Sequence, residues 1–423
     1  GVTARVKPAA GRSDIGAYEF DTDALTCSLA AAPLADFGPL ASVTFTSTVS
    51  GVNLDGLYYW WDFGTNGTVE VEGSAQAFFT TNLGYGFFSV GLTVSNSVGE
   101  VVSFARANYV EVAARTAYVA RAGWNTHTYP YATWATAASN IQAAIDAGWN
   151  GAVVNVTNGA YTQGRQIAIR EPIAVRSING AGVTTIDGGN AGYRGLELDH
   201  PSAVVDGFTV TRCSASMYGP AVHFVSGGQM LNCVVAGNSG GPYHRMIWVE
   251  AGGYMRNCVV RDNVIHRFAG VGGPATLENC LVTRNSSNYG GDTASSNEAC
   301  AVTGVLAYNC VFVDNTNLLQ TAVLVPDIEA STVHYSMCPQ TNTAWAASGV
   351  SNLTNRPVFV NTASNDFRFR FDSPGINVGT NLAWTLAPGA VDLSGYPRIV
   401  RYRVDMGPYE FIPPEKGTIV TIR

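Results

Sequence analysis

Four seven-residue segments, spaced along the middle of the chain, decide the fold. They read NCVVAGN (232–238), NCVVRDN (257–263), NCLVTRN (279–285) and NCVFVDN (309–315), and they align without gaps. Weaker copies begin at residues 207 and 335, so successive first positions lie 25, 25, 22, 30 and 26 residues apart. Repeats of this length are typical of solenoid proteins, in which each repeat forms one coil.

The first position of each segment predicts a sharp bend. It is Asn in four copies and Gly in one, the two residues that best tolerate a left-handed backbone. Residues two before the bend, and one and three after it, are apolar or small and would face inward. The set two before the bend comprises Val205, Met230, Met255, Leu277, Ala307 and Val333. With three short strands per coil, this pattern predicts an all-β fold with a right-handed parallel β-helix.

Two stacked rows are candidate structural ladders. Stacked Asn side chains can hydrogen-bond along their row, and stacked Cys side chains are small apolar groups for the core. Vertically stacked residues have parallel side-chain vectors, a poor geometry for disulfides, so we expect free thiols. The rows are Asn232, Asn257, Asn279 and Asn309, and Cys233, Cys258, Cys280 and Cys310. Four cysteines lie outside the row, and the sequence does not indicate whether they form disulfides: Cys27, Cys213, Cys300 and Cys338.

A helix is predicted over residues 137–147, where a solenoid needs a cap over its first coil. The surrounding motifs are Tyr118-Val119, Thr133-Trp134, IQAAID (141–146) and the stretch 151–161, with SPGINVG (373–379) and DMGPYEF (405–411) near the end. Together they resemble a widespread group of secreted bacterial β-helix proteins. The resemblance covers residues 116–411 and implies the same fold there.

Residues 24–113 predict a separate β-sandwich. Short stretches of alternating apolar and polar residues, such as VTFTSTV and FFSVGLTVSN, are separated by Gly, Asn and Asp. The motif WDFG (61–64) and the stretch 86–94 resemble the polycystic-kidney-disease (PKD) domain, an Ig-like module. The family's usual Asp-Gly after WDFG is Thr65-Asn66 here. The resemblance implies a spacer or adhesive module with Trp61 packed in its core.

The chain carries nearly the same ending twice. DIGAYEF (14–20) matches DMGPYEF (405–411), read as the closing strand of a solenoid, and the two Phe positions lie 391 residues apart. We therefore expect 1–22 to be the tail of a preceding solenoid. Residues 412–423 would be a linker and the first strand of a following Ig-like module, able to insert into a neighbouring copy. The candidate assembly residues are Asp14, Gly16, Tyr18, Phe20, Asp405, Gly407, Tyr409 and Phe411.

Composition restricts the classes of function. The net charge is −7, and of the 24 basic residues only Lys7 and Lys416 are lysine. Without a basic run, nucleic-acid binding and binding to anionic membranes are disfavoured. No CxxC pair occurs and the six His share no metal-ligand spacing, so neither a metal site nor a cofactor is predicted.

The sequence favours a non-catalytic structural or adhesive role, outside the cell or on its surface. The partners would be neighbouring copies of the chain or similar modules, joined head to tail. The alternative is a secreted polysaccharide lyase or glycoside hydrolase, or a carbohydrate-binding module. The residues weighed for it are Arg261, Asp262 and Asp314 at turns, Asp292 and Glu298 in the insertion 286–300, a strip of His244, Arg245, His266 and Arg267, and the aromatics Trp124, Tyr129 and Tyr131. Arg261, Asp262 and Asp314 are more simply interpreted as solvent-exposed turn residues.

Overall fold

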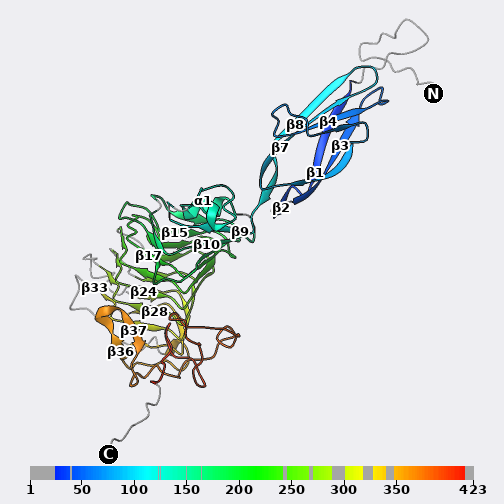
Figure 1. Ribbon diagram of the computed structural model, residues 1–423. Coiled ribbons are helices and arrows are strands. Elements are labelled where there is room, and N and C mark those ends of the chain that lie inside the picture. The colour runs from blue at the N-terminus through cyan, green and yellow to red at the C-terminus, as the bar shows by residue number, and fades with distance from the viewer. Residues whose placement is uncertain are drawn as a thin grey trace, which may run out of the picture. The chain divides into compact units, whose positions relative to one another are not determined.

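The computed structural model describes residues 24–38, 41–121, 123, 125–148, 150–162, 164–241, 245–265, 270–287, 301–317, 327–339 and 347–414. The chain divides between Ala114 and Arg115 into two compact units. Both units are built mainly from β-strands (Figure 1). The expectations for 1–22 and for the last residues, 415–423, lie outside the described residues.

The first unit consists of two sheets that enclose one apolar core. The first sheet contains β1 (Thr26–Ala32), β3 (Ala41–Ser50) and β6 (Phe78–Leu83). The second has the order β2 (Ala35–Phe37), β8 (Val101–Ala113), β7 (Gly86–Ser95), β4 (Tyr58–Phe63) and β5 (Val71–Gly73). Neighbouring strands are antiparallel except β2 and β8, which are parallel.

Alternation along the strands explains this core. In β3 the side chains of Ala41, Val43 and Phe45 are buried, whereas those between them are not. Trp61 of β4 is fully buried, as predicted, with its ring 5.8 Å from that of Phe45. Its Nε1 donates a hydrogen bond to the backbone oxygen of Gln76 at 3.0 Å, so the one polar atom of the indole is satisfied.

The second unit is a parallel β-solenoid, which confirms that part of the prediction from the repeats. Its largest sheet has the order β9 (Thr116–Val119), β10 (Val153–Val156), β13 (Ala174–Ser177), β16 (Val204–Asp206), β19 (Gly228–Leu231), β23 (Gly253–Arg256), β27 (Thr276–Glu278), β31 (Leu306–Tyr308) and β35 (Thr332–His334). The second contains β11 (Gly159–Thr162), β14 (Thr184–Asp187), β17 (Thr209–Thr211), β20 (Val234–Ala236), β24 (Val259–Arg261), β28 (Leu281–Thr283) and β32 (Val311–Val313). The third contains β12 (Ile167–Ile169), β15 (Leu196–Leu198), β18 (Val222–Phe224), β22 (Ile247–Val249), β26 (Val271–Gly272), β30 (Val302–Thr303) and β34 (Ile328–Glu329).

The predicted inward row stacks in register. Val205 of β16 pairs with Met230 of β19, and Met230 with Met255 of β23. The row continues through Leu277 and Ala307 to the last of its members in β35. Every member is fully buried. Stacking like residues on successive coils therefore builds the continuous core that no single coil could form.

A fourth sheet departs from the expected three strands per coil. It contains β21 (Ser239–Gly240), β25 (Val264–Ile265), β29 (Ser286–Ser287) and β33 (Thr316–Asn317). Each strand follows directly after the last residue of one aligned segment, such as Asn238 or Asn263. The strands are only two residues long, too short for a periodicity that sequence analysis could detect.

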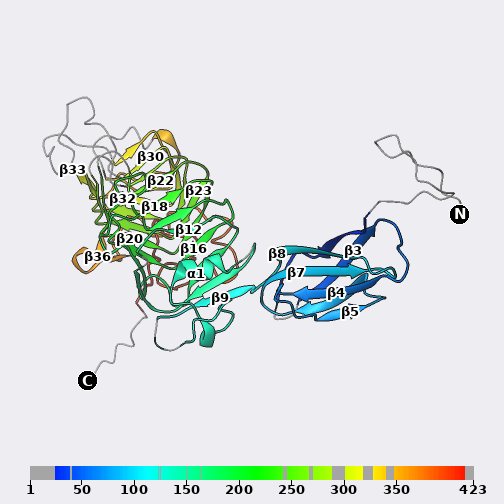
Figure 2. The same cartoon turned by 90° about the horizontal axis from the view of Figure 1, so that it is seen from above.

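The single α-helix of the described residues is shorter than predicted. Helix α1 spans Ile141–Asp146 and follows the 3₁₀-helix η1 (Trp134–Thr136). It starts after Asn140 because that side chain caps the helix by accepting from the backbone N–H of Ala143. Figure 2 shows α1 beside the first coils, where it contacts β9, β10 and β12. No helix in the described ranges is long and apolar enough to cross a membrane.

The buried side chain of Gln142 lets α1 complete the edge strand β12. Its Oε1 accepts the backbone N–H of Ala168 at 2.7 Å, and its Nε2 donates to the backbone oxygen of the same residue at 3.0 Å. A side-chain amide thus satisfies two backbone groups that a preceding strand would otherwise pair. An edge strand closed in this way cannot pair with another chain at that point.

Regular coils end at β35, well before residue 411. Beyond β35, Met337 makes single bridges to Val311 and Leu353. The described residues 347–414 then form a C-terminal region with one two-stranded sheet, β36 (Phe359–Asn361) and β37 (Asp366–Phe369), and the 3₁₀-helix η3 (Thr362–Ser364). The segment 405–411, predicted as a closing strand, has no strand structure. Its backbone groups bond instead to side chains and to single backbone groups of other segments, such as Gly375 and Asn309.

Candidate functional site: the asparagine ladders and the closing segment

The bend asparagines have the left-handed backbone that the sequence predicted. The φ angles of Asn232, Asn257, Asn279 and Asn309 lie between 51° and 54°. The flanking bend residues Gly207 and Tyr335 have φ values of 82° and 48°. Asn favours this conformation because its short polar side chain can hydrogen-bond locally.

Hydrogen bonds link some, but not all, neighbouring members of this bend ladder. Asn257 Nδ2 donates to Asn232 Oδ1 at 3.1 Å, and Asn309 Nδ2 donates to Asn279 Oδ1 at 3.2 Å. Between Asn257 and Asn279 the row is interrupted, because Asn279 Nδ2 donates instead to the backbone oxygens of Asp405 at 3.1 Å and Gly407 at 3.3 Å. The bend ladder therefore also holds the C-terminal region of the chain.

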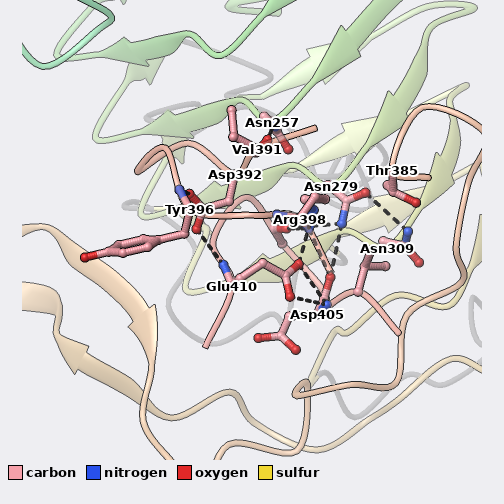
Figure 3. Close-up of polar contacts among 12 residues, drawn as sticks. Asn257, Asn279, Asn309, Thr385, Val391, Asp392, Tyr396, Arg398, Asp405 and Glu410 are labelled. Carbon is pink, nitrogen blue, oxygen red and sulfur yellow. Dashed lines mark hydrogen bonds and ion pairs between the residues drawn. The ribbon is translucent and has the colours of Figure 1, made fainter. Parts of the chain in front are cut away.

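Two other bend asparagines, Asn257 and Asn309, hold the C-terminal region in the same way (Figure 3). Asn257 Nδ2 donates to the backbone oxygen of Val391 at 2.9 Å. Asn309 makes a two-bond clamp with Thr380, donating to its backbone oxygen at 2.9 Å and accepting its N–H at 2.7 Å. The backbone oxygen of Asn309 also accepts the N–H of Gly407 at 2.6 Å. Three successive coils thus present one amide each to the returning chain.

We define residues 392–411 as the closing segment. The side chain of Arg398 bonds to several other residues of this segment. The side chain is 1% exposed, and Nη2 donates to the backbone oxygens of Asp405 at 3.1 Å and Gly407 at 2.6 Å. Its Nε lies 3.2 Å from Glu410 Oε1, forming a buried ion pair. Arg398 and Asn279 therefore bind the same two carbonyl groups from different parts of the chain, as Figure 3 shows.

Three buried carboxylates, those of Asp392, Asp405 and Glu410, accept hydrogen bonds from backbone N–H groups near this arginine. Asp405 accepts the N–H groups of Asn377 at 2.7 Å and Phe411 at 2.5 Å. Asp392 accepts the N–H groups of Tyr396 at 2.9 Å and Glu410 at 2.8 Å. Burial raises the pKa of both Glu410 and Asp405, and the charge of Arg398 opposes that shift. The carboxylates are occupied by the chain's own backbone, so the cluster organises the chain itself.

The candidate assembly residues therefore have structural roles in the second copy of the motif. Gly407 has a φ of 87°, which favours glycine, and its N–H and oxygen both bond to the solenoid side. Tyr409 packs on an apolar cluster that includes Val311 and Met406. The first-copy residues, Asp14, Gly16, Tyr18 and Phe20, lie outside the described residues.

Sequence analysis missed Arg398 and Asp392. A signal for the arginine was present, because a basic residue precedes the motif Asp by seven positions in both copies, Lys7 before Asp14 and Arg398 before Asp405. Asp392 offers no such signal, because the equivalent position of the first copy, thirteen residues before the motif Asp, is Gly1.

A second asparagine ladder was also missed, although each aligned segment ends in Asn. Its members are Asn238, Asn263, Asn285 and Asn315, all buried. Each of the first three donates from Nδ2 to Oδ1 of the next, at 2.9, 2.8 and 2.9 Å. Each Nδ2 also donates to a backbone oxygen of an earlier coil, such as Val235 for Asn263 at 2.9 Å. This inner ladder is continuous, unlike the bend ladder.

The ladder cysteines are free and buried, as expected. Each thiol lies near the backbone oxygen two residues before it and one on the preceding coil. For Cys258 these are the oxygens of Arg256 and Met230, both at 3.3 Å. Burial raises the pKa of Cys233, Cys258 and Cys280 well above the usual thiol range. These thiols act as core groups that also satisfy backbone carbonyls.

We expect these thiols not to react with iodoacetamide in the folded chain. Alkylation needs the thiolate, which burial disfavours, so Cys258 and Cys280 should be modified only after unfolding in guanidinium. The partly exposed Cys27 is the internal comparison. Peptide mass spectrometry that found ladder cysteines modified as fast as Cys27 would show that the coils open in the native state.

Asp327 lies near the last member of the inner ladder. It is 3% exposed, and the thiol of Cys338 lies 3.8 Å from its Oδ2. Burial raises the pKa of Asp327 to about 7, and the nearby Asn315 opposes this shift in part. The carboxyl group is therefore protonated in the folded chain under mildly acidic conditions.

Replacing Asp327 by Asn should change the pH dependence of stability. The folded-state pKa of Asp327 lies above its usual 3.8, so its contribution is fully present below that value and is lost as pH rises through about 7. At about pH 8, Asp327→Asn should be more stable than the unmodified chain by a few kcal/mol, about 1.4 per pKa unit. Urea denaturation at several pH values measures this, and a difference that does not vary with pH would contradict it.

The residues weighed for catalysis hold chain segments together wherever they are described. Asp262 pairs with Arg261 at 2.6 Å and with Arg284 at 2.7 Å. Arg284 also donates to the backbone oxygen of Thr362 in η3. Asp314 pairs with Arg356 of the C-terminal region. The hydrogen bond of Arg284 and the ion pair of Asp314 therefore fasten the C-terminal region to the coils.

Six other candidates for catalysis or binding lie outside the described residues: Asp292, Glu298, Trp124, His244, His266 and Arg267. Tyr129 and Tyr131 are half-buried, with ring centroids 6.3 Å apart.

Within the described ranges, no group of three or more His, Cys, Asp or Glu side chains is arranged to hold a metal ion. No protein-family model matches the chain, and no curated protein matches it.

Proposed function

We propose that this chain is a non-catalytic structural or adhesive module, one period of an extracellular array of sandwich and solenoid units. The observation that carries the proposal is the repeated ending. Its second copy is a buried cluster that fastens the end of a solenoid, so the first copy predicts another solenoid before the sandwich. The five shared positions include Asp405, Gly407 and Glu410, whose groups bond within that cluster.

The same proposal assigns the finer identity of each unit. The first unit would be a PKD-type, Ig-like sandwich, a reading supported by its two sheets and by the core position of Trp61. The second would be a right-handed β-helix of the secreted bacterial type. Helix α1 would cap its first coil, which the pairing of Gln142 with the edge strand β12 supports.

The non-catalytic part of the proposal is tested by incubating the purified chain with a panel of acidic and sulfated polysaccharides, with and without Ca²⁺. We expect no release of unsaturated or reducing ends. Release of either product would overturn the structural assignment in favour of a lyase or hydrolase.

A second candidate function, glycan binding, is favoured by an outward surface of the third solenoid sheet. The rings of Tyr218 and Trp248 lie 5.4 Å apart, and the Arg245 guanidinium lies 5.1 Å from the Trp248 ring. Beside them, His223 Nε2 lies 2.9 Å from Glu250 Oε1. Aromatic rings next to a few fixed polar groups are characteristic of ligand-binding surfaces, and the arginine favours an acidic glycan.

Replacing Trp248 by Ala tests this candidate. If the surface binds acidic polysaccharide, affinity electrophoresis should show roughly tenfold weaker retention of Trp248→Ala, because about 1.4 kcal/mol of ring contact is lost. The matched control is Trp134→Ala, since Trp134 is 41% exposed and also packs on a Tyr ring. Equal retention of both variants would remove glycan binding at this surface.

A further inference from the structure

Two exposed apolar patches lie where neighbouring periods of the proposed array would be joined. The first is a groove of about 360 Å³ at the end of the second unit, which we call the terminal groove. Its exposed apolar residues are Val360, Phe371, Tyr396 and Ile412, which are 47%, 77%, 44% and 40% exposed. Pro414, the last described residue, also lines it. The chain therefore leaves the described region at this groove.

The second patch lies at one end of the sandwich and consists of Leu54, Val98 and Val101. These side chains are 46%, 62% and 65% exposed. Hydrogen bonding places their loops together, because the N–H of Ser97 donates to the backbone oxygen of Asp55 at 3.0 Å. In the ladder between β7 and β8, Ser95 pairs with Val101 at this same end. We call this end of the first unit the N-terminal pole.

The described chain also begins at the N-terminal pole. Thr26, the first residue of β1, pairs with Ser50 at the end of β3. A Cβ added to Gly51 would lie 2.8 Å from the backbone oxygen of Ala24, so this loop is packed against the start of the chain. Strand β8 then runs from Val101 at this pole to Ala113, beside the boundary with the second unit. The chain thus begins the sandwich beside the exposed patch and leaves it at the other end of β8.

The spacing of the repeated ending fixes how close a following sandwich would be. Strand β1 begins six residues after Phe20, and the same count after Phe411 reaches Gly417. Gly417 is three residues beyond Pro414, a length that spans at most about 10 Å when extended. A sandwich starting there would have its N-terminal pole held beside the terminal groove, at an effective concentration on the order of millimolar.

We propose that the terminal groove binds the N-terminal pole of the sandwich in the next copy of the chain, an inference that rests on the proposed array. Leu54, Val98 and Val101 would cover the apolar side chains of the groove, which water otherwise contacts. The contact would make the joint between periods stiff.

Paired cysteines test this contact in two forms of the protein. Both carry Phe371→Cys and Val98→Cys in a background with Cys27→Ser and Cys300→Ser. The first form is the full chain at high concentration. The second is a two-copy polypeptide in which residue 416 of one copy is followed by residue 26 of the next. The matched control replaces Phe371→Cys by Tyr402→Cys, because Tyr402 is 88% exposed in the same region but does not line the groove.

In the two-copy polypeptide we expect the disulfide between the first copy's position 371 and the second copy's position 98 to form at least about tenfold faster than in the control. In the full chain the same pair should yield a ladder of linked oligomers on non-reducing gels. Cross-linking no faster than the control overturns the proposal. A separate full-length variant carries Phe371→Cys and Ile419→Cys. A disulfide between these two positions within one chain would also overturn the proposal, because it would assign the groove to the chain's own last residues. Failure of the cross-link in a protein whose native form still shows repeating units would reject this contact without rejecting the array.

Discussion

Replacing Arg398 by Ala is expected to lower the free energy of unfolding of the second unit by about 3 to 5 kcal/mol, the usual cost of breaking a buried ion pair. The substitution leaves Glu410, 2% exposed, without its cation. It also removes the donor shared by the backbone oxygens of Asp405 and Gly407. Guanidinium denaturation followed by circular dichroism measures the effect.

The matched control for this substitution is Arg370→Ala. Arg370 pairs with Asp372 at 3.1 Å, but its side chain is 49% exposed. Exposed pairs of this kind contribute about 0 to 1 kcal/mol, so the control should unfold nearly as the unmodified chain does. If Arg398→Ala behaved like Arg370→Ala, the closing segment would not depend on the buried cluster.

Replacing Asn263 by Ala should cost about 3 kcal/mol or more, because several buried groups lose their partners at once and each costs about 1 to 3. Asn263 Oδ1 accepts from the backbone N–H of Asn238 at 3.0 Å and from its Nδ2 at 2.9 Å. Its Nδ2 donates to Asn285 Oδ1 and to the backbone oxygen of Val235. An alanine satisfies none of these groups, and the coils above and below are both affected.

An exposed asparagine pair provides the control for the inner ladder. Asn179 Nδ2 donates to Asn158 Oδ1 at 2.8 Å, but this contact is exposed to water. Asn179→Ala should therefore change stability by no more than about 0.5 kcal/mol. An Asn263→Ala variant that lost less than about 1 kcal/mol would mean that water enters the coil and replaces the ladder bonds.

The repeats were sufficient to predict the solenoid and its inward row, because these depend on local rules. An Asn at a bend indicates a left-handed backbone at that residue. The alternation of apolar and polar residues indicates which side chains face the core. The position of Met230 on Met255 then follows from the repeat length alone. The same reasoning explains why the free thiols of the cysteine row could be expected.

The closing cluster could not be predicted, because its contacts join residues far apart in sequence. Asn279 and Asp405 are separated by 126 positions, and no local pattern indicates that the first binds the backbone of the second. Asp405 and Gly407 were singled out through repetition alone, while the chemistry that uses them depends on Arg398. The inner ladder was visible in the alignment, but an Asn after a polar residue or Gly is equally typical of a turn.

Electron microscopy of the native material that contains this chain tests the central claim most directly. If the repeated ending marks one period of an array, sandwich units and solenoid units should alternate along a continuous particle. Mass spectrometry of the same material should then find the closing motif at every solenoid end. Particles that consist of one isolated sandwich and one isolated solenoid, with nothing before the first copy of the motif, would contradict the account.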